Sequence, residues 1–398
     1  MKILIAEDES VSRSLLMRTL EKWGYEVIAT EDGAAALEAF QKEKFSIVIT
    51  DWMMPKMDGI ELVRNIRSLD CSDYVYVIML TAKSDKEDLV EGMNAGADDF
   101  VSKPFDKDEL RVRISAGKRV IGLEKDLSKR NKDLEDANQR MRVDLEAAAQ
   151  IQKALLPDSA PETDEVQIAW KFFPCDELAG DILNVFKLSE KELGFYVLDV
   201  SGHGVPAALL AVTLSRMLSP VADEASLLYS TNGTPGKAVR PPLDVATQLN
   251  KRFQVDAQHG QYFTFLYGMY DRENRKIRYV SAGHPGVVFA SKETGVKILE
   301  VPSLPIGFME ETIYEEAIID MKPGDRIYIY SDGIPEAEGA ESELFGKERM
   351  ISSLNKTLDM TIEESLDVLL ADVESFTVAD TFRDDVSLLG IEIKELDE

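Results

Sequence analysis

The sequence predicts two domains of different fold class, a parallel α/β domain and an α+β layered domain, joined by a long helix. Three observations support this prediction. Short apolar segments alternate with helical ones in residues 1–118, a polar segment with a heptad repeat follows, and longer strand-like segments bounded by turns then dominate. A chain of 398 residues is also too long for one ordinary hydrophobic core. We therefore expect one domain over residues 1–118, a helical linker over 119–156 and a second domain over 157–398.

The first domain is expected to contain strands and helices in strict alternation. The expected strands are 2–6, 25–29, 46–50, 74–80 and 99–101, and the expected helices include 10–23 and 33–42. This order is typical of a parallel five-stranded, doubly wound sheet with helices on both faces. Ligand chemistry in such a sheet occurs at the carboxyl ends of the strands.

Polar residues follow the ends of four of these strands. Glu7 and Asp8 follow the first strand, Asp51 the third, Thr81 the fourth and Lys103 the fifth. Crowded carboxylates repel one another unless a cation such as Mg²⁺ lies between them. A metal-bound aspartate can attack a phosphoryl donor, and a lysine can then pair with the phosphoryl oxygens. One strand-end carboxylate alone usually caps the next helix, but five polar positions in register favour a phosphoryl-transfer site.

The first 118 residues resemble response-regulator receiver domains in the segments IVITDWMMPKMDG, MLTA and GADDFVSKPF. The resemblance implies that Asp51 accepts a phosphoryl group from a cognate histidine kinase. It further implies that Thr81 and Lys103 contact that group and that Phe100 is the aromatic switch residue. The Mg²⁺ ligands that it implies are Glu7, Asp8, Asp51 and the backbone of Met53.

The linker is predicted to be one helix from about Gly117 to Leu156. No Gly or Pro occurs from Leu123 until Pro157, which ends the pattern. Every seventh residue forms a narrow, mainly apolar seam: Val120, Leu127, Leu134, Met141, Ala148 and Leu155. Such a seam is typical of a coiled coil, and polar companion positions favour loose pairing. We expect a homodimer through residues 117–156, with a solvated spacer helix as the alternative.

The second domain is expected to combine long strands with grouped helices, which favours an α+β layered fold. The expected strands are 166–173, 182–188, 194–200, 263–271, 276–281, 286–290, 326–331 and 386–393. The expected helices are 206–218, 242–257, 346–358 and 362–375. Residues 230–241 are rich in Gly, Pro, Ser and Thr, so we expect a mobile surface loop there.

Acidic residues occur at four strand ends or turns of the second domain, namely at Asp181, Asp199, Asp332 and the pair Asp384-Asp385. Glycine lies near three of the four positions, which allows backbone and ligand to approach closely. A lone Asp-Gly pair is typical of a tight turn. Four such positions with few histidines instead favour two hard cations, which together can activate a bridging water for phosphoryl displacement.

Residues 150–391 resemble the metal-dependent PPM protein serine/threonine phosphatases, and specifically their bacterial stage II sporulation E branch. The matching segments are AQIQKALLP, LAGDIL, LDVSGHGVPAALL, SAGHPGVVF, LPIGF, MKPGDRIYIYSDGIPEAEG, LFGKERM and RDDVSLLGI. The resemblance implies two Mn²⁺ or Mg²⁺ ions and makes Asp199 a catalytic residue. The implied ligands are Asp181, Asp199, the carbonyl of Ser201 or Gly202, Asp332 and Asp384, with Asp385 as a weaker candidate.

Three further positions lie inside these motifs. Asn184 stands where the family often has a second aspartate, and an amide binds metal ions more weakly than a carboxylate. His203 and His284 are expected to be hydrogen-bonded structural residues beside the site, rather than ligands.

Together the resemblances imply an enzyme in which phosphorylation of Asp51 controls a protein serine/threonine phosphatase. The implied substrate is a phosphorylated anti-sigma-factor antagonist of a partner-switching pathway. The helix over 117–156 is expected to transmit the receiver's state, so that residues 149–157 reposition the metal site. The alternative is an adaptor with weak or no catalysis that binds a sigma factor or similar regulatory protein. The four retained aspartates argue against it.

Composition excludes several other functions. The formal charge of −28 repels nucleic acid and anionic lipid, and no helix-turn-helix candidate follows the linker, so we expect neither DNA nor membrane binding. Cys71 and Cys175 match no disulfide or zinc spacing and are expected to be reduced thiols. With no signal pattern and no apolar run of membrane-spanning length, we expect a cytoplasmic protein.

Overall fold

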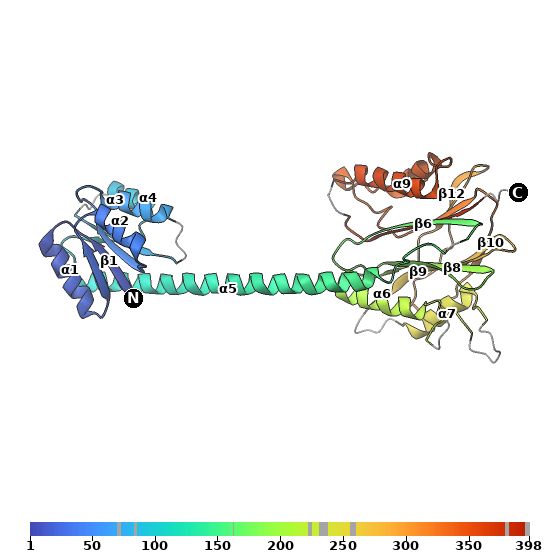
Figure 1. Ribbon diagram of the computed structural model, residues 1–398, viewed down its shortest axis with the longest axis horizontal. Coiled ribbons are helices and arrows are strands. Elements are labelled where there is room, and N and C mark those ends of the chain that lie inside the picture. Colours follow the sequence, from blue (N-terminus) through green and yellow to red (C-terminus); the bar gives the residue numbers. More distant parts are fainter. Residues whose placement is uncertain are drawn as a thin grey trace. The chain divides into compact units, whose positions relative to one another are not determined.

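The computed structural model describes residues 1–69, 73–82, 86–161, 163–221, 225–230, 238–254, 260–378 and 382–394, with backbone alone for 86–89. The chain divides into two compact units, a first unit over Met1–Arg140 and a second unit over Met141–Glu398 (Figure 1). Cys71 and residues 231–237 of the expected surface loop lie outside the described residues. Among the helices that the structure describes, none is long and apolar enough to cross a membrane.

The first unit contains a five-stranded parallel sheet in the order β2-β1-β3-β4-β5, which confirms the predicted α/β fold. Its strands are β1 (Lys2–Ala6), β2 (Glu26–Thr30), β3 (Ile47–Asp51), β4 (Tyr76–Thr81) and β5 (Asp99–Ser102). Its helices are α1 (Ser10–Lys22), α2 (Gly33–Lys42), α3 (Gly59–Ser68) and α4 (Lys86–Ala95), followed by the start of α5.

Both faces of this sheet are buried, which explains why its strands are continuously apolar rather than alternating. Leu4, Val48 and Val77 belong to a core on one face that includes residues of α2 and α3. Ile3 and Ile49 belong to the opposite core, which includes residues of α1 and α5. The sheet is therefore a rigid support for the residues at its carboxyl edge.

Helix α5 (Lys107–Lys153) is the linker, and it starts earlier than the sequence predicted. Its first turns belong to the first unit, where Leu110 and Ile114 are fully buried in the core. Gly117 does not mark the helix start. Instead it allows close packing, because a Cβ there would lie 2.5 Å from the ring of Tyr76. At ~1.5 Å per residue the 47 residues span about 70 Å.

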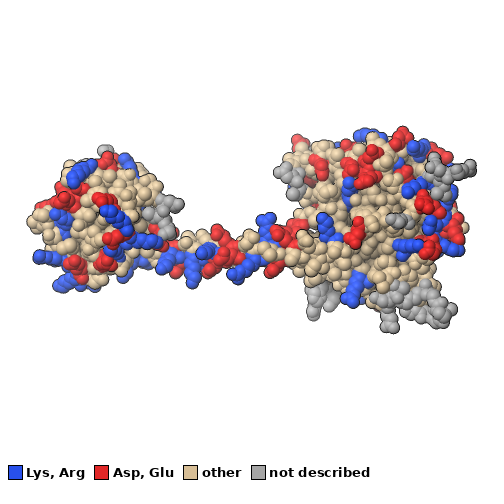
Figure 2. Space-filling view, viewed as in Figure 1, with Lys and Arg blue, Asp and Glu red and all other residues tan. Residues whose placement is uncertain are grey.

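The seam of α5 is used differently along its length. Val120 packs against the core of the first unit, and Leu155, just beyond the helix, packs against a core of the second. Between them, Leu127, Leu134 and Met141 are 54%, 60% and 59% exposed. Figure 2 shows acidic and basic side chains interspersed over the rest of the helix surface. The middle of α5 therefore presents an apolar stripe on an otherwise charged rod.

The second unit is a stack of four layers, with two antiparallel sheets between two pairs of helices (Figure 1). One sheet has the order β13-β10-β9-β8-β7, and the other β12-β11-β14-β15-β6. Their strands are β6 (Val166–Phe173), β7 (Ile182–Lys187), β8 (Glu192–Val200), β9 (Phe263–Asp271), β10 (Lys276–Ala282), β11 (Val287–Ser291), β12 (Gly295–Leu299), β13 (Glu316–Asp320), β14 (Arg326–Tyr330) and β15 (Val386–Ile393). The helices are α6 (Val205–Met217), α7 (Pro242–Arg252), α8 (Gly346–Asn355) and α9 (Ile362–Phe376), with a short 3₁₀ turn η1 at Ala340–Ser342.

Three apolar cores hold these layers together. One lies between the sheets, one between the first sheet and helices α6 and α7, and one between the second sheet and helices α8 and α9. The predicted layered fold is confirmed. Strands β12 and β13 were not predicted. Helix α7 ends at Arg252, earlier than its predicted end at residue 257, and residues 255–257 lie outside the described residues.

Candidate active site

The acidic pocket of the first unit consists of Glu7, Asp8 and Asp51. Each offers one carboxylate oxygen, and the three atoms lie within 4.8 Å of one another. Lys103 crosses this pocket, because its Nζ donates to Asp51 Oδ2 at 2.6 Å and to Glu7 Oε1 at 2.9 Å. Burial raises the pKa of Glu7, and the charge of Asp51 adds to this effect while Lys103 opposes it. The three oxygens suit a hard cation such as Mg²⁺.

Asp51 is placed by the backbone around it. It ends β3, and its Oδ1 accepts a hydrogen bond from the N–H of Trp52 at 2.7 Å. Helix α3 begins very close to it, because a Cβ on Gly59 would lie 2.1 Å from the carbonyl oxygen of Asp51. Asp58 and Glu61 form a capping box that fixes this helix start.

Of the other predicted residues of the first unit, Thr81 ends a strand, Met53 lies in the loop after β3, and Phe100 lies within β5. Thr81 ends β4 and is 3% exposed. Met53 lies two residues after Asp51, with its side chain pointing to solvent. The ring of Phe100, in β5, lies 6.4 Å from that of Trp52. The structure therefore brings Glu7, Asp8, Asp51, Thr81 and Lys103 to the carboxyl edge of one sheet, while Phe100 lies within β5.

The aspartate centre of the second unit, defined here as Asp181, Asp199, Asp332 and Asp384, draws on both sheets. Asp181 precedes β7 and Asp199 lies near the end of β8, both in the first sheet. Asp332 follows β14 and Asp384 precedes β15, both in the second sheet. The centre thus lies where strand ends of the two sheets meet, which explains its assembly from distant segments.

These carboxyl groups strongly influence one another. Burial, followed by the charges of Asp199 and Asp385, raises the pKa of Asp181 well above its usual range. The pKa of Asp199 is raised to about 7 by burial and by the charges of Asp332 and Asp384. That of Asp332 is raised to about 6, again mainly by burial. Without a cation, the charged forms of these groups are destabilised.

A divalent cation fits this centre chemically. Asp181 is 2% exposed, and its Oδ2 has no hydrogen-bond partner among the described residues. A buried carboxylate oxygen without a donor is costly, and a metal ion is a matching partner. In the described chain, Asp181, Asp199 and Asp332 do not form one group with all ligand atoms within 4.8 Å. A wider spread is expected of ligands that hold two ions roughly 3.5–4 Å apart.

Asp384 and Asp385 have different surroundings, which the sequence could not show. Asp385 is 4% exposed, and its carboxylate accepts hydrogen bonds from the backbone N–H of Cys175, Gly180 and Asp181, at 2.8, 2.7 and 3.3 Å. Asp384 accepts one from the N–H of Asp385 at 2.8 Å, and its residue is exposed. Asp385 therefore fixes the loop that carries Asp181, while Asp384 retains oxygen atoms for other partners.

The glycines of the centre permit a close approach of two loops. A Cβ on Gly180 would lie 2.9 Å from the carbonyl oxygen of Val200 and 3.3 Å from that of Gly202. Gly202 has a positive φ of 88°, a conformation that favours glycine. The carbonyl of Val200 was not among the predicted ligands, although its oxygen lies closer to a Cβ on Gly180 than that of Gly202 does.

The end of helix α5 contacts the loop before Asp181. The Gln152 side chain is hydrogen-bonded to the backbone of Ala179, and the amide nitrogen of Asn184 donates to the carbonyl oxygen of Leu155 at 3.4 Å. The Oδ1 atom of Asn184 accepts from the N–H of Val185 at 2.8 Å. Asn184 thus contacts the end of the linker, a role that the sequence did not reveal.

His203 and His284 differ in their burial and in their contacts. His284 is buried, and its Nδ1 lies 2.7 Å from Oγ1 of Thr264, the residue paired with Asp199 across β8 and β9. Burial lowers the pKa of His284 to about 3, so its ring is neutral. This agrees with a structural role. His203 is exposed, and its Nδ1 lies 3.2 Å from Asp176.

Comparison with known proteins matches two parts of the chain to two protein families. The family model of the response regulator receiver domain matches residues 3–115, and that of stage II sporulation protein E (SpoIIE) matches residues 189–394. The transcriptional regulatory protein RprY of Bacteroides fragilis is 40% identical over 116 residues, 29% of this chain and 48% of that protein. The alkaline phosphatase synthesis transcriptional regulatory protein PhoP of Bacillus subtilis is 40% identical over 115 residues. The matched segment is 29% of this chain and 47% of that protein. The chain therefore spans about half the length of these curated relatives.

A solved structure shows the fold of the second unit. The SiaA-PP2C domain of Pseudomonas aeruginosa aligns with a TM-score of 0.53 and 21% identity, covering 65% of this chain and 99% of that domain. The second unit therefore has a PP2C-like fold.

Proposed function

The chain belongs to the stage II sporulation protein E family, and on that basis we propose that phosphorylation of Asp51 in its receiver domain controls a metal-dependent protein serine/threonine phosphatase. In this proposal the receiver comprises residues 1–118, the linker 119–156 and the phosphatase domain 157–398. One observation supports catalysis most directly: the aspartate centre gathers carboxylates from both sheets around Oδ2 of Asp181, which has no hydrogen-bond partner among the described residues.

The phosphatase site would hold two Mn²⁺ or Mg²⁺ ions. The proposed ligands are Asp181, Asp199, Asp332, Asp384 and the carbonyl of Ser201 or Gly202. When bound, the ions supply a water of lowered pKa and stabilise charge on the phosphoryl oxygens. Asp199 comes from one sheet and Asp332 from the other, so the protein fixes the spacing of the ligands through two rigid supports. Asp385 contributes by fixing the amides of Gly180 and Asp181.

The receiver site would accept the phosphoryl group of a cognate histidine kinase. Asp51 would attack the phosphorus through a carboxylate oxygen, so that a P–O bond forms as the P–N bond to the phosphohistidine of the kinase breaks. Glu7 and Asp8 would hold Mg²⁺, which supplies positive charge beside the phosphoryl oxygens. Lys103 stays charged, because its bonds to Asp51 and Glu7 outweigh the effect of burial and raise its pKa. Its Nζ, 2.6 Å from Asp51 Oδ2, is placed to pair with a phosphoryl oxygen.

The proposed substrate is a phosphorylated protein, and the resemblance to the family favours an anti-sigma-factor antagonist in partner switching. The proposed active form is a homodimer that pairs through α5. The exposed stripe of Leu127, Leu134 and Met141 supports pairing, because an apolar heptad seam is stabilised when a second helix covers it. The hydrogen bonds between Gln152 and Ala179 would then transmit a change in the conformation of the linker to the aspartate centre.

Hydrolysis of p-nitrophenyl phosphate by the full chain tests the catalytic part of this proposal. The assay compares Mn²⁺ with EDTA, and the wild type with Asp199→Ala and with Asp359→Ala, an aspartate whose side chain is 92% exposed. We expect Mn²⁺-dependent turnover that Asp199→Ala abolishes and Asp359→Ala retains. If no condition gives turnover, including treatment with a small phosphodonor, the protein is better described as an adaptor that binds a sigma factor or another regulatory protein.

A further inference from the structure

A loop over residues 307–313 of the second unit exposes large apolar side chains. The residues on either side of it, Ile306 and Tyr314, are buried in the core between the first sheet and helices α6 and α7. Three side chains of the loop are more than half exposed, at 52%, 55% and 87%, namely Phe308, Met309 and Ile313. A single exposed apolar side chain is ordinary, but three within one short loop are typical of a surface that binds another protein.

The backbone of this loop is held by a buried asparagine. Asn250, in helix α7, is 2% exposed, and its Oδ1 accepts a hydrogen bond from the N–H of Gly307 at 2.8 Å. Its Nδ2 donates to the carbonyl oxygens of Met309 and Glu310 at 3.0 and 3.2 Å. The hydroxyl of Thr312 also donates to the carbonyl oxygen of Met309, at 2.8 Å. Because the backbone is already fixed, a partner that binds the loop has little ordering entropy to overcome.

One aromatic residue links the loop to the turn that supplies a proposed metal ligand. The ring of Tyr262 lies 5.7 Å from that of Phe308 and nearly perpendicular to it. The carbonyl oxygen of Tyr262 accepts from the N–H of Ser201 at 2.9 Å, and its own N–H donates to Oγ of Ser201 at 3.1 Å. Gly202 and Phe308 are both exposed, and Tyr262 is half-buried. A protein that binds at this turn therefore meets Tyr262 and the loop as neighbouring surface.

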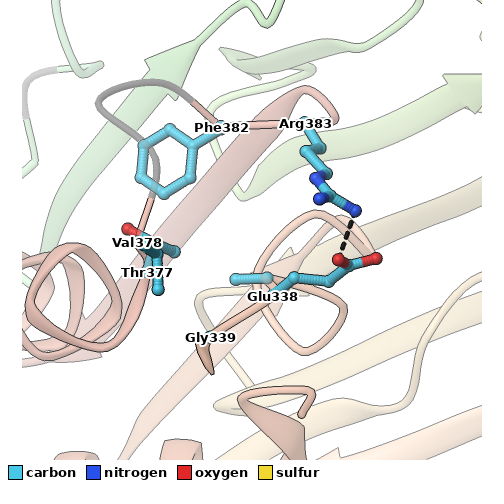
Figure 3. Close-up of a pocket in the computed structure, with 7 residues that line it drawn as sticks. Glu338, Gly339, Thr377, Val378, Phe382 and Arg383 are labelled. Atoms are coloured by element: carbon cyan, nitrogen blue, oxygen red, sulfur yellow. Dashed lines mark hydrogen bonds and ion pairs between the residues drawn. The ribbon is translucent and has the colours of Figure 1, made fainter. Parts of the chain in front are cut away.

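The loop also carries negative charge. Three exposed glutamates lie in it or just beyond it, namely Glu310, Glu311 and Glu315. Residues 301–315 contain neither Lys nor Arg. The segment that leads into Asp384 differs, because there Arg383 forms an ion pair with Glu338 (Figure 3). A partner that complements the loop would therefore present apolar side chains with Lys or Arg beside them.

We propose that the 307–313 loop docks the phosphorylated substrate protein, through an apolar surface flanked by basic residues, while its phosphoserine or phosphothreonine lies at the aspartate centre. The inference rests on the proposed phosphatase function and names the surface that selects its protein substrate. The substrate is the partner that the structure favours, because the loop contacts Tyr262, which is hydrogen-bonded to the turn of Ser201. A small substrate such as p-nitrophenyl phosphate does not need this surface.

The test is binding of two fluorescein-labelled peptides to the full chain with Mn²⁺, measured by fluorescence anisotropy. Both peptides carry lysines and a central phosphonate analogue of phosphoserine, which a phosphatase cannot hydrolyse. One peptide has leucines at the second, fourth and sixth positions on each side of the analogue, and the other has serines there. In an extended chain these positions reach ~20 Å from the analogue, so the test does not depend on one exact spacing.

The variant combines Met309→Ser with Ile313→Ser, because both side chains are exposed and their removal leaves the core intact. Phe308 is kept, since its ring contacts Tyr262 and its loss would also disturb the metal turn. The matched control is Met360→Ser. Met360 is 41% exposed and lies between α8 and α9, the helices of the opposite outer layer.

We expect the wild type and Met360→Ser to bind the leucine peptide roughly tenfold more tightly than the serine peptide. The double variant should bind both peptides about equally and turn over p-nitrophenyl phosphate like the wild type. Equal binding of the two peptides by the wild type, no binding of either, or an unchanged preference in the double variant would overturn the docking surface. So would a loss of p-nitrophenyl phosphate turnover in the double variant, because the loop would then support the metal turn. Absence of that turnover in the wild type is a separate result, which counts against the phosphatase function itself.

Discussion

The side chain of Gln152 forms two hydrogen bonds with the backbone of Ala179. Nε2 of Gln152 donates to the carbonyl oxygen at 2.6 Å, and the N–H of Ala179 donates to Oε1 at 3.0 Å. The next two N–H groups, those of Gly180 and Asp181, donate to Asp385. A continuous set of hydrogen bonds therefore connects the last turn of helix α5 with a proposed metal ligand.

We predict that Gln152→Ala uncouples the phosphatase from the receiver. The substitution leaves both polar groups of Ala179 without these partners, which should lower the free energy of unfolding by about 1–3 kcal/mol. The ratio of turnover with and without phosphodonor should fall toward one. The control is Gln150→Ala, an exposed glutamine two residues earlier in the same helix. A ratio equal to that of the wild type would show that this contact does not couple the receiver to the phosphatase.

Asp384→Ala and Asp385→Ala should have opposite main effects. Asp385→Ala removes the acceptor of three backbone N–H groups, so we expect the free energy of unfolding in EDTA to fall by roughly 3 kcal/mol. Asp384→Ala should cost less stability but weaken Mn²⁺ binding more. Chemical denaturation and titration calorimetry measure the two quantities. The reverse order would assign the ligand to Asp385.

Asp181→Asn should stabilise the metal-free protein. Burial and the charge of Asp199 raise the pKa of Asp181, so its ionised form opposes folding at neutral pH. A neutral amide of similar shape removes that cost but binds metal poorly. Thermal unfolding should therefore give a higher midpoint than the wild type in EDTA and a smaller increase on adding Mn²⁺. A lower midpoint in EDTA would contradict this electrostatic account.

His284 should make the second unit less stable in acid. Its pKa is about 3 in the folded protein, below its ordinary value of 6.5, so only the unfolded chain takes up a proton between these values. Its contribution to stability is complete above pH 6.5 and is lost progressively as the pH falls toward 3. In His284→Asn the fall of unfolding free energy with decreasing pH should be less steep. Equal slopes would mean that the folded protein also protonates His284.

Much of the fold could be predicted because local patterns and tertiary structure agree. The strands 2–6, 166–173, 263–271 and 386–393 were predicted with the observed bounds, since each is an apolar segment between clear breaks. The start of α5 was predicted too late in the chain, because a glycine such as Gly117 normally weakens a helix. Here its missing side chain makes room for Tyr76, which no local pattern reveals.

The sequence could predict which residues form the site, but not which contacts each of them makes. Strand-end aspartates such as Asp51 and Asp199 stand out in the sequence because several carboxylates occur at strand ends of the same domain, which helix capping and turn formation alone do not explain. The distinction between Asp384 and Asp385 depends on which one meets the N–H groups of a loop some 200 positions earlier in the chain. Gln152 resembles any polar residue of a solvated helix, and only its burial against Ala179 reveals its role.

The most direct test of receiver control is phosphatase turnover of the full chain before and after treatment with a small phosphodonor, with Asp51→Asn as the control. The account predicts that the phosphodonor changes the turnover of the wild type severalfold and leaves that of Asp51→Asn unchanged. If the treated wild type and Asp51→Asn turn over at the same rate, phosphorylation of Asp51 does not control the enzyme, and the central claim is wrong.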